Sequence, residues 1–123
     1  MIYLLIGLGG FLGANARYLV GSWVAERYGA SFPYGTLVIN VTGSFVIGFF
    51  FVLVTEHVID HPHWRLFFIT GFLGAYTTFS TFSFETFALL QERTYLLALA
   101  NMGGSVILGV LAVVLGVIAA RLL

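Results

Sequence analysis

The sequence predicts an all-α membrane protein in which four helices cross the bilayer. Three observations predict this class: 60% of the 123 residues are hydrophobic, only 8% are charged, and the apolar residues fall into four long segments. A soluble domain carries about 25% charged residues, so most of this surface cannot face water. The segments lack the alternation typical of strands, and in lipid only helices or closed barrels satisfy the backbone. We therefore expect a four-helix bundle.

Each segment is long enough to cross about 30 Å of hydrocarbon as a helix. The expected helices cover residues 2–25, 34–55, 66–90 and 95–120, all within one transmembrane domain that comprises residues 1–123. The polar stretches that end these helices begin at Glu26, Glu56, Gln91 and Arg121.

Small and polar residues recur every three or four positions in the first, second and fourth segments. The first carries Gly9, Gly13, Arg17 and Gly21; the second carries Thr36, Asn40, Ser44 and Gly48; the fourth carries Asn101, Ser105, Gly109, Ala112 and Gly116. This spacing forms one stripe of a helix, and small residues there let helices approach closely in a membrane. Close packing explains the glycines. It does not explain Arg17, Asn40 or Asn101, which we expect to face protein or water.

The third segment contains the least regular helical sequence, GFLGAYTTFSTF from Gly71 to Phe82. Gly and Thr are poor helix formers, and Ser and Thr hydroxyls compete for backbone groups. We therefore expect the third helix to break near Thr77 and Thr78, in the middle of the membrane. Such a break is tolerated only where it lines a cavity or is buried in protein, and broken helices can coordinate Na⁺ through their carbonyls.

Arg17 and Glu85 are ionisable residues expected inside the bundle. They lie at similar distances from the ends of the first and third helices, which run in the same direction, so they share a depth. An ion pair is one interpretation, and a functional site is the other, because ionisable groups inside membranes are commonly functional. Asn40 and Asn101 lie near the starts of the two opposed helices, so all four polar groups gather towards one membrane face.

All five basic residues are arginines, and they favour neither orientation in the membrane. Arg65 and Arg121 fall on one side and Arg27 and Arg93 on the other, whereas the positive-inside rule needs an excess on one side. One interpretation is that a small chain simply has few charges. The other is that both orientations insert, and that an inverted second copy completes the functional unit with polar openings at both faces.

The polar stretch after the expected break could contact a small anion. Phe79 and Phe82 share a helix face beside Ser80 and Thr81, and a phenyl ring has a positive edge. An unpaired ion in a low-dielectric interior costs tens of kcal/mol, whereas one hydrogen bond to a charged group returns only about 1.5–3 kcal/mol. Several weak donors in series are therefore required, and Asn40 could add its amide. The simpler alternative is that the rings pack and the hydroxyls bond to i−4 carbonyls.

Three motifs together resemble the Fluc/CrcB family of fluoride channels. They are GGFLGANARY (Gly9–Tyr18), GTLVINVTGSFVIG (Gly35–Gly48) and GFLGAYTTFSTFSFE (Gly71–Glu85), and the resemblance covers nearly the whole chain. It implies an antiparallel, dual-topology homodimer of four-helix subunits that exports fluoride passively from the cytoplasm across the inner (plasma) membrane. It also implies a Na⁺ ion on the two-fold axis, held by carbonyls at the break in the third helix.

The same resemblance implies roles for individual residues. The fluoride pathway would include Asn40, Phe79, Phe82, Ser80, Thr81, Ser105, Glu85 and Arg17. Gly74 and Thr77 would supply backbone oxygens to the Na⁺ ion. The chain departs from the family motif at Ala75, where a second glycine is usual, and Tyr76 follows.

Two rival functions stay open. A small multidrug-resistance exporter is also short, four-helical and dual-topology, but that class couples export to protons through a glutamate in its first helix. Here the first helix has no carboxylate before Glu26. A scaffold protein would use the small-residue stripes for packing alone.

Composition argues against other classes. We expect no enzyme, because the sequence contains neither a nucleophile–base pair nor a metal-ligand cluster, and the zero net charge argues against nucleic acid as a partner. With no cysteine, disulfides and thiolate metal sites are excluded. His57, His61 and His63 are expected to be solvated loop residues. The expected partners are fluoride, a second copy of the chain and the lipid bilayer.

Overall fold

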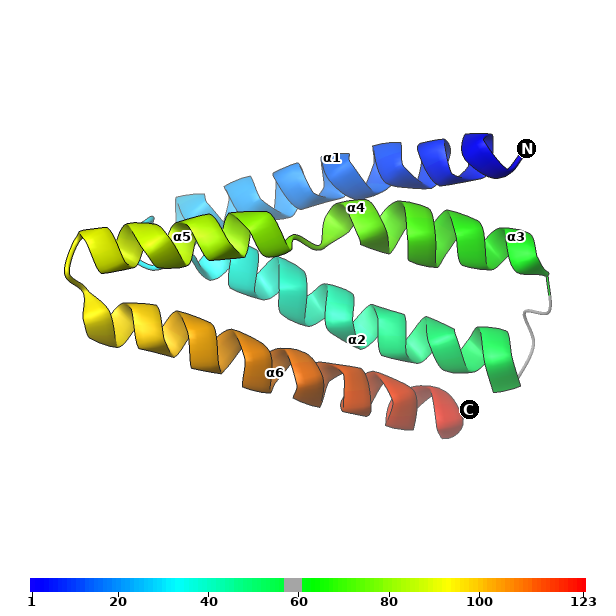
Figure 1. Cartoon of the computed structure of the whole chain (residues 1–123). Helices are drawn as coiled ribbons and strands as arrows, with labels where there is room; N and C mark the ends of the chain where they lie inside the picture. The colour runs from blue at the N-terminus through cyan, green and yellow to red at the C-terminus, as the bar shows by residue number, and fades with distance from the viewer. Residues whose placement is uncertain (57–60) are drawn as a thin grey trace.

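The computed structural model describes residues 1–56 and 61–123, and these residues form helices joined by short turns. In order, the helices are α1 (Ile2–Tyr28), α2 (Tyr34–Glu56), α3 (Pro62–Trp64), η1 (Arg65–Leu73), α4 (Gly74–Tyr76), α5 (Phe79–Gln91) and α6 (Tyr95–Arg121). Figure 1 shows the chain passing four times along the molecule, with α3, η1, α4 and α5 following one another in the third pass. The predicted all-α architecture of four passes is confirmed for the described residues.

Two helix ends lie more than one residue outside the predicted bounds. α1 continues to Tyr28, because residues 26–28 contain neither Gly nor Pro. It ends at Gly29, whose φ of 80° is a conformation that glycine adopts without strain. The third pass begins at Pro62 instead of residue 66, since proline fits the first turn of a helix. The side chain of His61 caps this start by accepting a hydrogen bond from the N–H of His63.

The third pass changes its hydrogen bonding before it breaks. In η1 the backbone bonds span five residues, and the N–H of Gly74 reaches the carbonyl of Ile69. Thr77 (ψ 156°) and Thr78 (ψ 124°) are then extended, and α5 begins at Phe79. The predicted interruption of the third helix is therefore confirmed. Among the described helices, α1, α2 and α6 are each long and apolar enough to cross a membrane uninterrupted.

Glycines bring the helix backbones into direct contact. The most extensive pairings are α2 with α6 and α1 with η1. A Cβ added at Gly13 would overlap the carbonyl oxygen of Phe72, and one at Gly116 would overlap that of Phe45. The other glycines with no room for a side chain against a neighbouring helix are Gly9, Gly43, Gly48 and Gly71. The small-residue stripes of the first, second and fourth passes therefore pack helices together, as expected.

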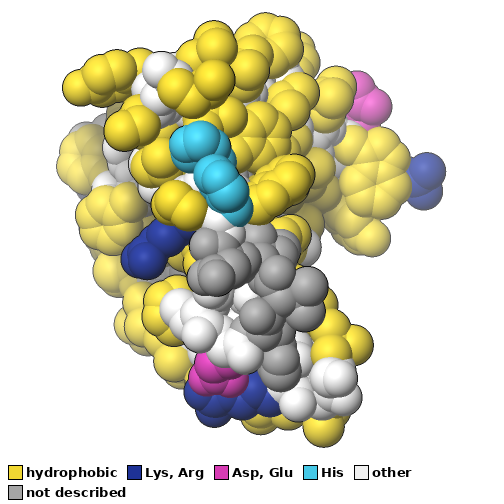
Figure 2. Space-filling model, turned by 90° about the vertical axis from the view of Figure 1, so that its right-hand side faces the viewer, with side chains coloured by type: hydrophobic (Ala, Val, Ile, Leu, Met, Phe, Trp, Pro, Cys, Tyr) yellow, Lys and Arg dark blue, Asp and Glu magenta, His cyan; other side chains and the backbone are white. Residues whose placement is uncertain are grey.

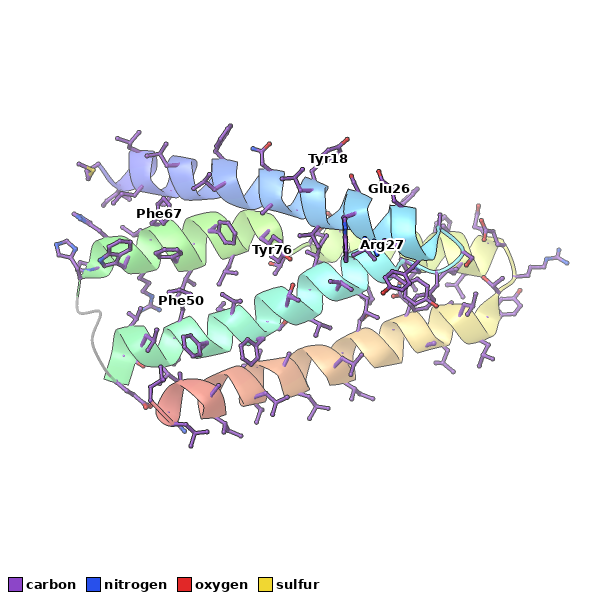
Figure 3. All side chains as sticks on the ribbon, turned by 180° about the vertical axis from the view of Figure 1, so that it is seen from behind. Tyr18, Glu26, Arg27, Phe50, Phe67 and Tyr76 are labelled. Atoms are coloured by element: carbon purple, nitrogen blue, oxygen red, sulfur yellow. The ribbon has the colours of Figure 1, made fainter. Side chains whose placement is uncertain are left out.

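Few apolar side chains are buried within the single chain. A small cluster of Ile39, Leu73 and Tyr76 forms where α2 meets the third pass, and Figure 3 shows Tyr76 between these segments. The outer surface is largely hydrophobic, with small clusters of charged and histidine side chains at the end seen in Figure 2. One of these clusters is the ion pair of Arg121 and Glu56, at 2.8 Å. A surface this apolar requires lipid or another protein against it.

Candidate functional site

The linker between α4 and α5 is held by the side chain of Asn40 on α2. The Asn40 Nδ2 donates to the carbonyl of Thr78, and the Thr78 N–H donates to Asn40 Oδ1, each at 2.9 Å. One amide therefore satisfies both backbone polar groups of a residue that the break removes from helix. An amide nitrogen carries two donors, so one Asn40 N–H is left for another acceptor.

A pocket of about 400 Å³, here called the central pocket, opens beside this linker. Its polar and aromatic lining comes from α2, the third pass and α6, and includes Asn40, Ser44, Thr77, Phe79, Phe82 and Ser105. The rings of Phe79 and Phe82 lie 5.8 Å apart between centroids, at an interplanar angle of 50°. None of the residues lining this pocket is charged. Its polar contacts for an ion are hydroxyls, an amide and backbone groups, beside the rings of Phe79 and Phe82.

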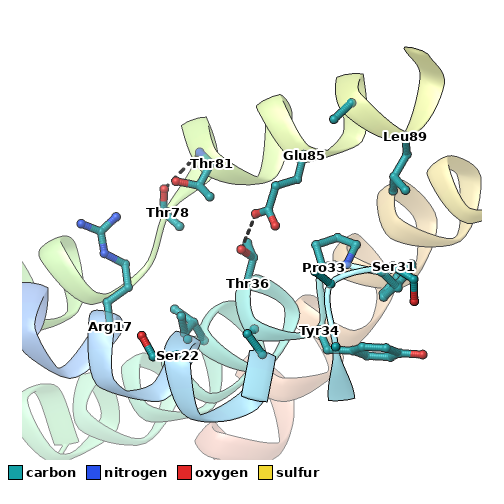
Figure 4. Close-up of a pocket in the computed structure, with 18 of the residues that line it drawn as sticks. Arg17, Ser22, Ser31, Pro33, Tyr34, Thr36, Thr78, Thr81, Glu85 and Leu89 are labelled. Carbon is teal, nitrogen blue, oxygen red and sulfur yellow. Dashed lines mark hydrogen bonds between the residues drawn. The ribbon is translucent and has the colours of Figure 1, made fainter. Parts of the chain in front are cut away.

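A second pocket of about 450 Å³, here called the mouth pocket, lies between the C-terminal half of α1, the start of α2 and α5. Figure 4 shows Arg17 rising from α1 towards the linker and Glu85 reaching from α5 towards α2. The hydroxyl of Thr36 donates to a carboxylate oxygen of Glu85. The possible ion pair of Arg17 with Glu85 does not form: within the described residues, Arg17 has no salt bridge or hydrogen bond.

The two pockets adjoin the linker from different sides of the bundle, and Thr78 is the residue that lines both. The Thr78 side chain also accepts a hydrogen bond from the N–H of Thr81, at 3.3 Å, and so caps the start of α5. Asn40, Phe79, Phe82 and Ser105 line the central pocket, whereas Arg17, Thr81 and Glu85 line the mouth pocket. Ser80 is exposed and lines neither of them.

The backbone at the break can supply oxygens to a cation. In a continuous helix the N–H of Thr78 would donate to the carbonyl of Gly74, but here it donates to Asn40. The Gly74 carbonyl therefore lacks the bond that a helix would give it, and the extended conformation takes the Thr77 carbonyl out of helix. Both residues line the central pocket. Since freed carbonyls in broken membrane helices coordinate Na⁺, the residues expected to bind Na⁺ fit that group.

Two contributions were not expected from the sequence. Thr36 binds Glu85, although its position on the stripe that contains Asn40 is a signal for such a role. Thr78 lines both pockets, whereas the sequence indicated only that it would break the helix. Spacing along the chain could not show either role, because the contacts of Thr36 and of Thr78 are with residues of other helices.

Asn101 is buried and hydrogen-bonded to other side chains, and it does not face a pocket. It is 2% exposed and donates to the hydroxyl of Thr86 at 2.8 Å. Ser105 donates to its side-chain oxygen at 3.4 Å. Asn101 thus faces protein, as one expected alternative had it, and ties α6 to α5 without lining either pocket.

Of the histidines expected in a loop, His61 caps the start of α3, whereas His63 lies within this short helix. His61 and His63 are exposed, with ring centroids 4.3 Å apart. His57 lies outside the described residues. No group of three or more potential metal-ligating side chains of His, Cys, Asp or Glu occurs in residues 1–56 and 61–123.

Residues 4–117 match the family described as CrcB-like protein, Camphor Resistance (CrcB). Similar proteins bear the name fluoride-specific ion channel FluC. That of Solibacter usitatus is 52% identical over 98% of this chain and 99% of its own length. That of Acidobacterium capsulatum is 52% identical, with 96% and 94% covered, and that of Rhizobium meliloti is 50% identical, with 92% and 90% covered.

Proposed function

This chain belongs to the CrcB-like protein family, and from that membership we propose that it is a fluoride channel. The observation that carries the proposal is that the two pockets adjoin the same residue, Thr78, which places a charged mouth next to a polar but uncharged interior. In this proposal the two pockets form parts of a path that conducts an ion, and the protein is a channel and not an enzyme. The family match gives no support to a proton-coupled exporter.

The chemistry of the two pockets suits an anion that must lose its water. Arg17 would attract fluoride into the mouth pocket, where its guanidinium has no partner among the described residues. Beyond it, the free N–H of Asn40 and the edges of Phe79 and Phe82 would replace water one contact at a time. The hydroxyl of Ser105 would add a contact by turning its proton away from Asn101. Each such contact is weak compared with the cost of burying an ion. Weak, multiple sites let an ion leave as well as enter.

The functional unit in this proposal is an antiparallel, dual-topology homodimer. Two observations support it: the arginines of the loops and ends favour neither orientation, and the mouth pocket lies at one end of the subunit. An inverted second copy would supply a mouth at the opposite face. It would also cover apolar surface such as Phe79, which is 79% exposed in the single chain.

A Na⁺ ion held by the carbonyls of Gly74 and Thr77 belongs to the same proposal. When bound, it would supply a fixed positive charge and stabilise the broken backbone. Placed on the dimer axis, it would join the two copies through the same residues. We further propose that the channel lies in the inner (plasma) membrane, where it releases fluoride from the cytoplasm down its gradient.

Fluoride efflux from liposomes that contain the purified protein tests the function. We expect rapid, electrogenic efflux of fluoride with potassium and valinomycin as the compensating current, without any proton gradient. Chloride in place of fluoride measures selectivity in the same vesicles. Efflux that appears only when a proton gradient drives exchange of an organic cation would indicate an exporter, and no flux of either kind would indicate a scaffold.

A further inference from the structure

Tyr76, the last residue of α4, connects the end of this helix to α2. Its side chain is 8% exposed and stacks on Phe72, with ring centroids 5.8 Å apart and 14° between the planes. Its hydroxyl oxygen lies 2.9 Å from the hydroxyl oxygen of Thr42. Neither Ala75 nor Tyr76 lines the central pocket. The side chains of the two residues that follow Gly74 therefore pack into the protein and leave the central pocket open.

The direction of this hydrogen bond follows from the number of protons available. The hydroxyl of Thr42 has one proton, and the carbonyl of Val38, one turn earlier in α2, lies 2.7 Å away to accept it. The hydroxyl of Tyr76 therefore donates to Thr42. A tyrosine donor and a threonine acceptor thus join α4 to α2 immediately before the break.

The two residues that follow Tyr76 also contact α2. Gly43 leaves room for Thr77, because a Cβ added at Gly43 would overlap the Thr77 methyl group and lie 3.3 Å from the Tyr76 ring. Thr78 is bonded to Asn40 through both its N–H and its carbonyl. Three consecutive residues are therefore positioned on one face of α2, where the chain has lost helical bonds that would otherwise hold it.

We propose that Tyr76 and Thr42 are positioning residues for the helix break. Their hydrogen bond holds the end of α4 against α2, and this fixes where the carbonyls of Gly74 and Thr77 point. Without the bond, the stacked ring would still fill its site, but the backbone from Gly74 to Thr78 would sample more conformations. The consequence for cation binding rests on the proposed function, whereas the consequence for the backbone does not.

Hydrogen–deuterium exchange of the full-length protein in detergent micelles tests the positioning role. Tyr76→Phe keeps the ring and removes only the hydroxyl, and Thr42→Val removes the acceptor at nearly constant shape. Each should raise the exchange rate of backbone amides in residues 74–80 by about two- to tenfold, the range expected for one hydrogen bond between helices. Because both remove the same bond, the double variant should exchange no faster than either single one.

Three control variants separate this bond from general loss of hydroxyls. Thr42→Ser keeps the acceptor and should restore wild-type exchange. Thr55→Val removes a hydroxyl that also bonds one turn back, to Phe51 at 2.7 Å, and Tyr3→Phe removes one from a residue that is 88% exposed. Both should leave residues 74–80 unchanged. Wild-type exchange in Tyr76→Phe, or additive effects in the double variant, would overturn the proposal.

The Na⁺ requirement of fluoride efflux measures the consequence at the carbonyls. With Na⁺ titrated against N-methylglucamine in liposomes, Tyr76→Phe should need about two- to tenfold more Na⁺ for half-maximal flux, in line with its exchange rate. An unchanged requirement alongside faster exchange would show that the bond does not position the carbonyls, and would also overturn the proposal. If the wild-type protein carries no fluoride, the proposed function fails, and the exchange measurements alone decide the role of Tyr76.

Discussion

Asn40 illustrates how single side chains support a backbone that has left helix. Its amide bonds to the N–H and the carbonyl of Thr78, so two groups that would be costly to bury unpaired are satisfied by one residue. The hydroxyl of Thr77 bonds back to the carbonyl of Leu73 at 2.9 Å, which is the simpler interpretation of these hydroxyls that the sequence left open. At this scale, some polar residues of the third pass serve the fold while their neighbours line the pockets.

The aromatic rings of the central pocket carry the first prediction. Phe79→Ile and Phe82→Ile keep an apolar side chain but remove the ring edges, so fluoride flux should fall by about two- to tenfold for each. Phe84→Ile is the matched control, because Phe84 lies on α5 and lines neither pocket. The measurement is fluoride efflux from liposomes, with insertion and dimerisation checked by size-exclusion chromatography. Wild-type flux in both pocket variants would remove the rings from the mechanism.

Asn101 carries a prediction about stability. Asn101→Ala leaves the hydroxyl of Thr86 without its donor in a buried site, and should destabilise the protein by about 1–3 kcal/mol. Asn15→Ala is the control, because Asn15 is exposed and bonds only to a carbonyl of its own helix, that of Phe11. Thermal unfolding in detergent compares the two. Equal melting temperatures for Asn101→Ala and the wild-type protein would contradict this account of the α5–α6 contact.

At the scale of elements, the third pass is the least regular part of the described chain. Its η1 segment packs against α1 through backbone contacts at glycines, and the pass then breaks where three consecutive residues contact α2. α1, α2 and α6 run without interruption and form the frame around it. The broken element therefore depends on its neighbours for its position, and the contacts of α1 are part of what places the pockets.

The contact between α1 and η1 can be tested at one glycine. A Cβ at Gly13 would overlap the carbonyl oxygen of Phe72, so Gly13→Ala should push the helices apart and destabilise the protein by about 1–3 kcal/mol. Gly7→Ala is the control, since a Cβ there has nothing within 4 Å. This control should be neutral, or stabilising by up to about 1 kcal/mol through helix propensity. If thermal unfolding in detergent finds the two variants alike, the close backbone contact is not maintained.

At the scale of the whole molecule, the single chain leaves much of its apolar surface uncovered. Many large apolar side chains of α6 are exposed, among them Leu96, Leu99, Val106, Val110 and Leu115. Lipid can cover such a surface, but it cannot pair with the polar groups of the central pocket. In the proposed function, a second, inverted copy would cover apolar surface and also pair with polar groups of the central pocket.

Forced orientation tests the inverted pairing. Tyr28→Lys with Gln91→Lys adds positive charge to one end of the bundle, and His61→Lys with His63→Lys adds it to the other, so each pair should insert in a single orientation. Either pair expressed alone should lose fluoride flux, and their coexpression should restore it. Flux from liposomes and the accessibility of a terminal tag report function and orientation together. Normal conduction by a uniformly oriented protein would rule out antiparallel pairing.

The sequence by itself determined the architecture, because lipid leaves the backbone few choices. Long apolar segments must form helices in a bilayer, and Gly and Thr between Gly71 and Thr78 weaken one of them, so both the four passes and the interruption followed from local properties. The glycine stripes followed in the same way. Each of these inferences concerns residues that are near one another in the chain.

Only the tertiary structure decided which polar groups pair. Glu85 binds Thr36 and not Arg17, Asn40 binds the linker, and Asn101 is buried against Thr86. Helical spacing places these residues at similar depths but does not say which face of each helix turns towards which neighbour. That rotation is set by the close contacts of glycines such as Gly13 and Gly48 with the backbones of neighbouring helices. The pairing of buried groups is therefore a property of the packed helices and not of any one segment.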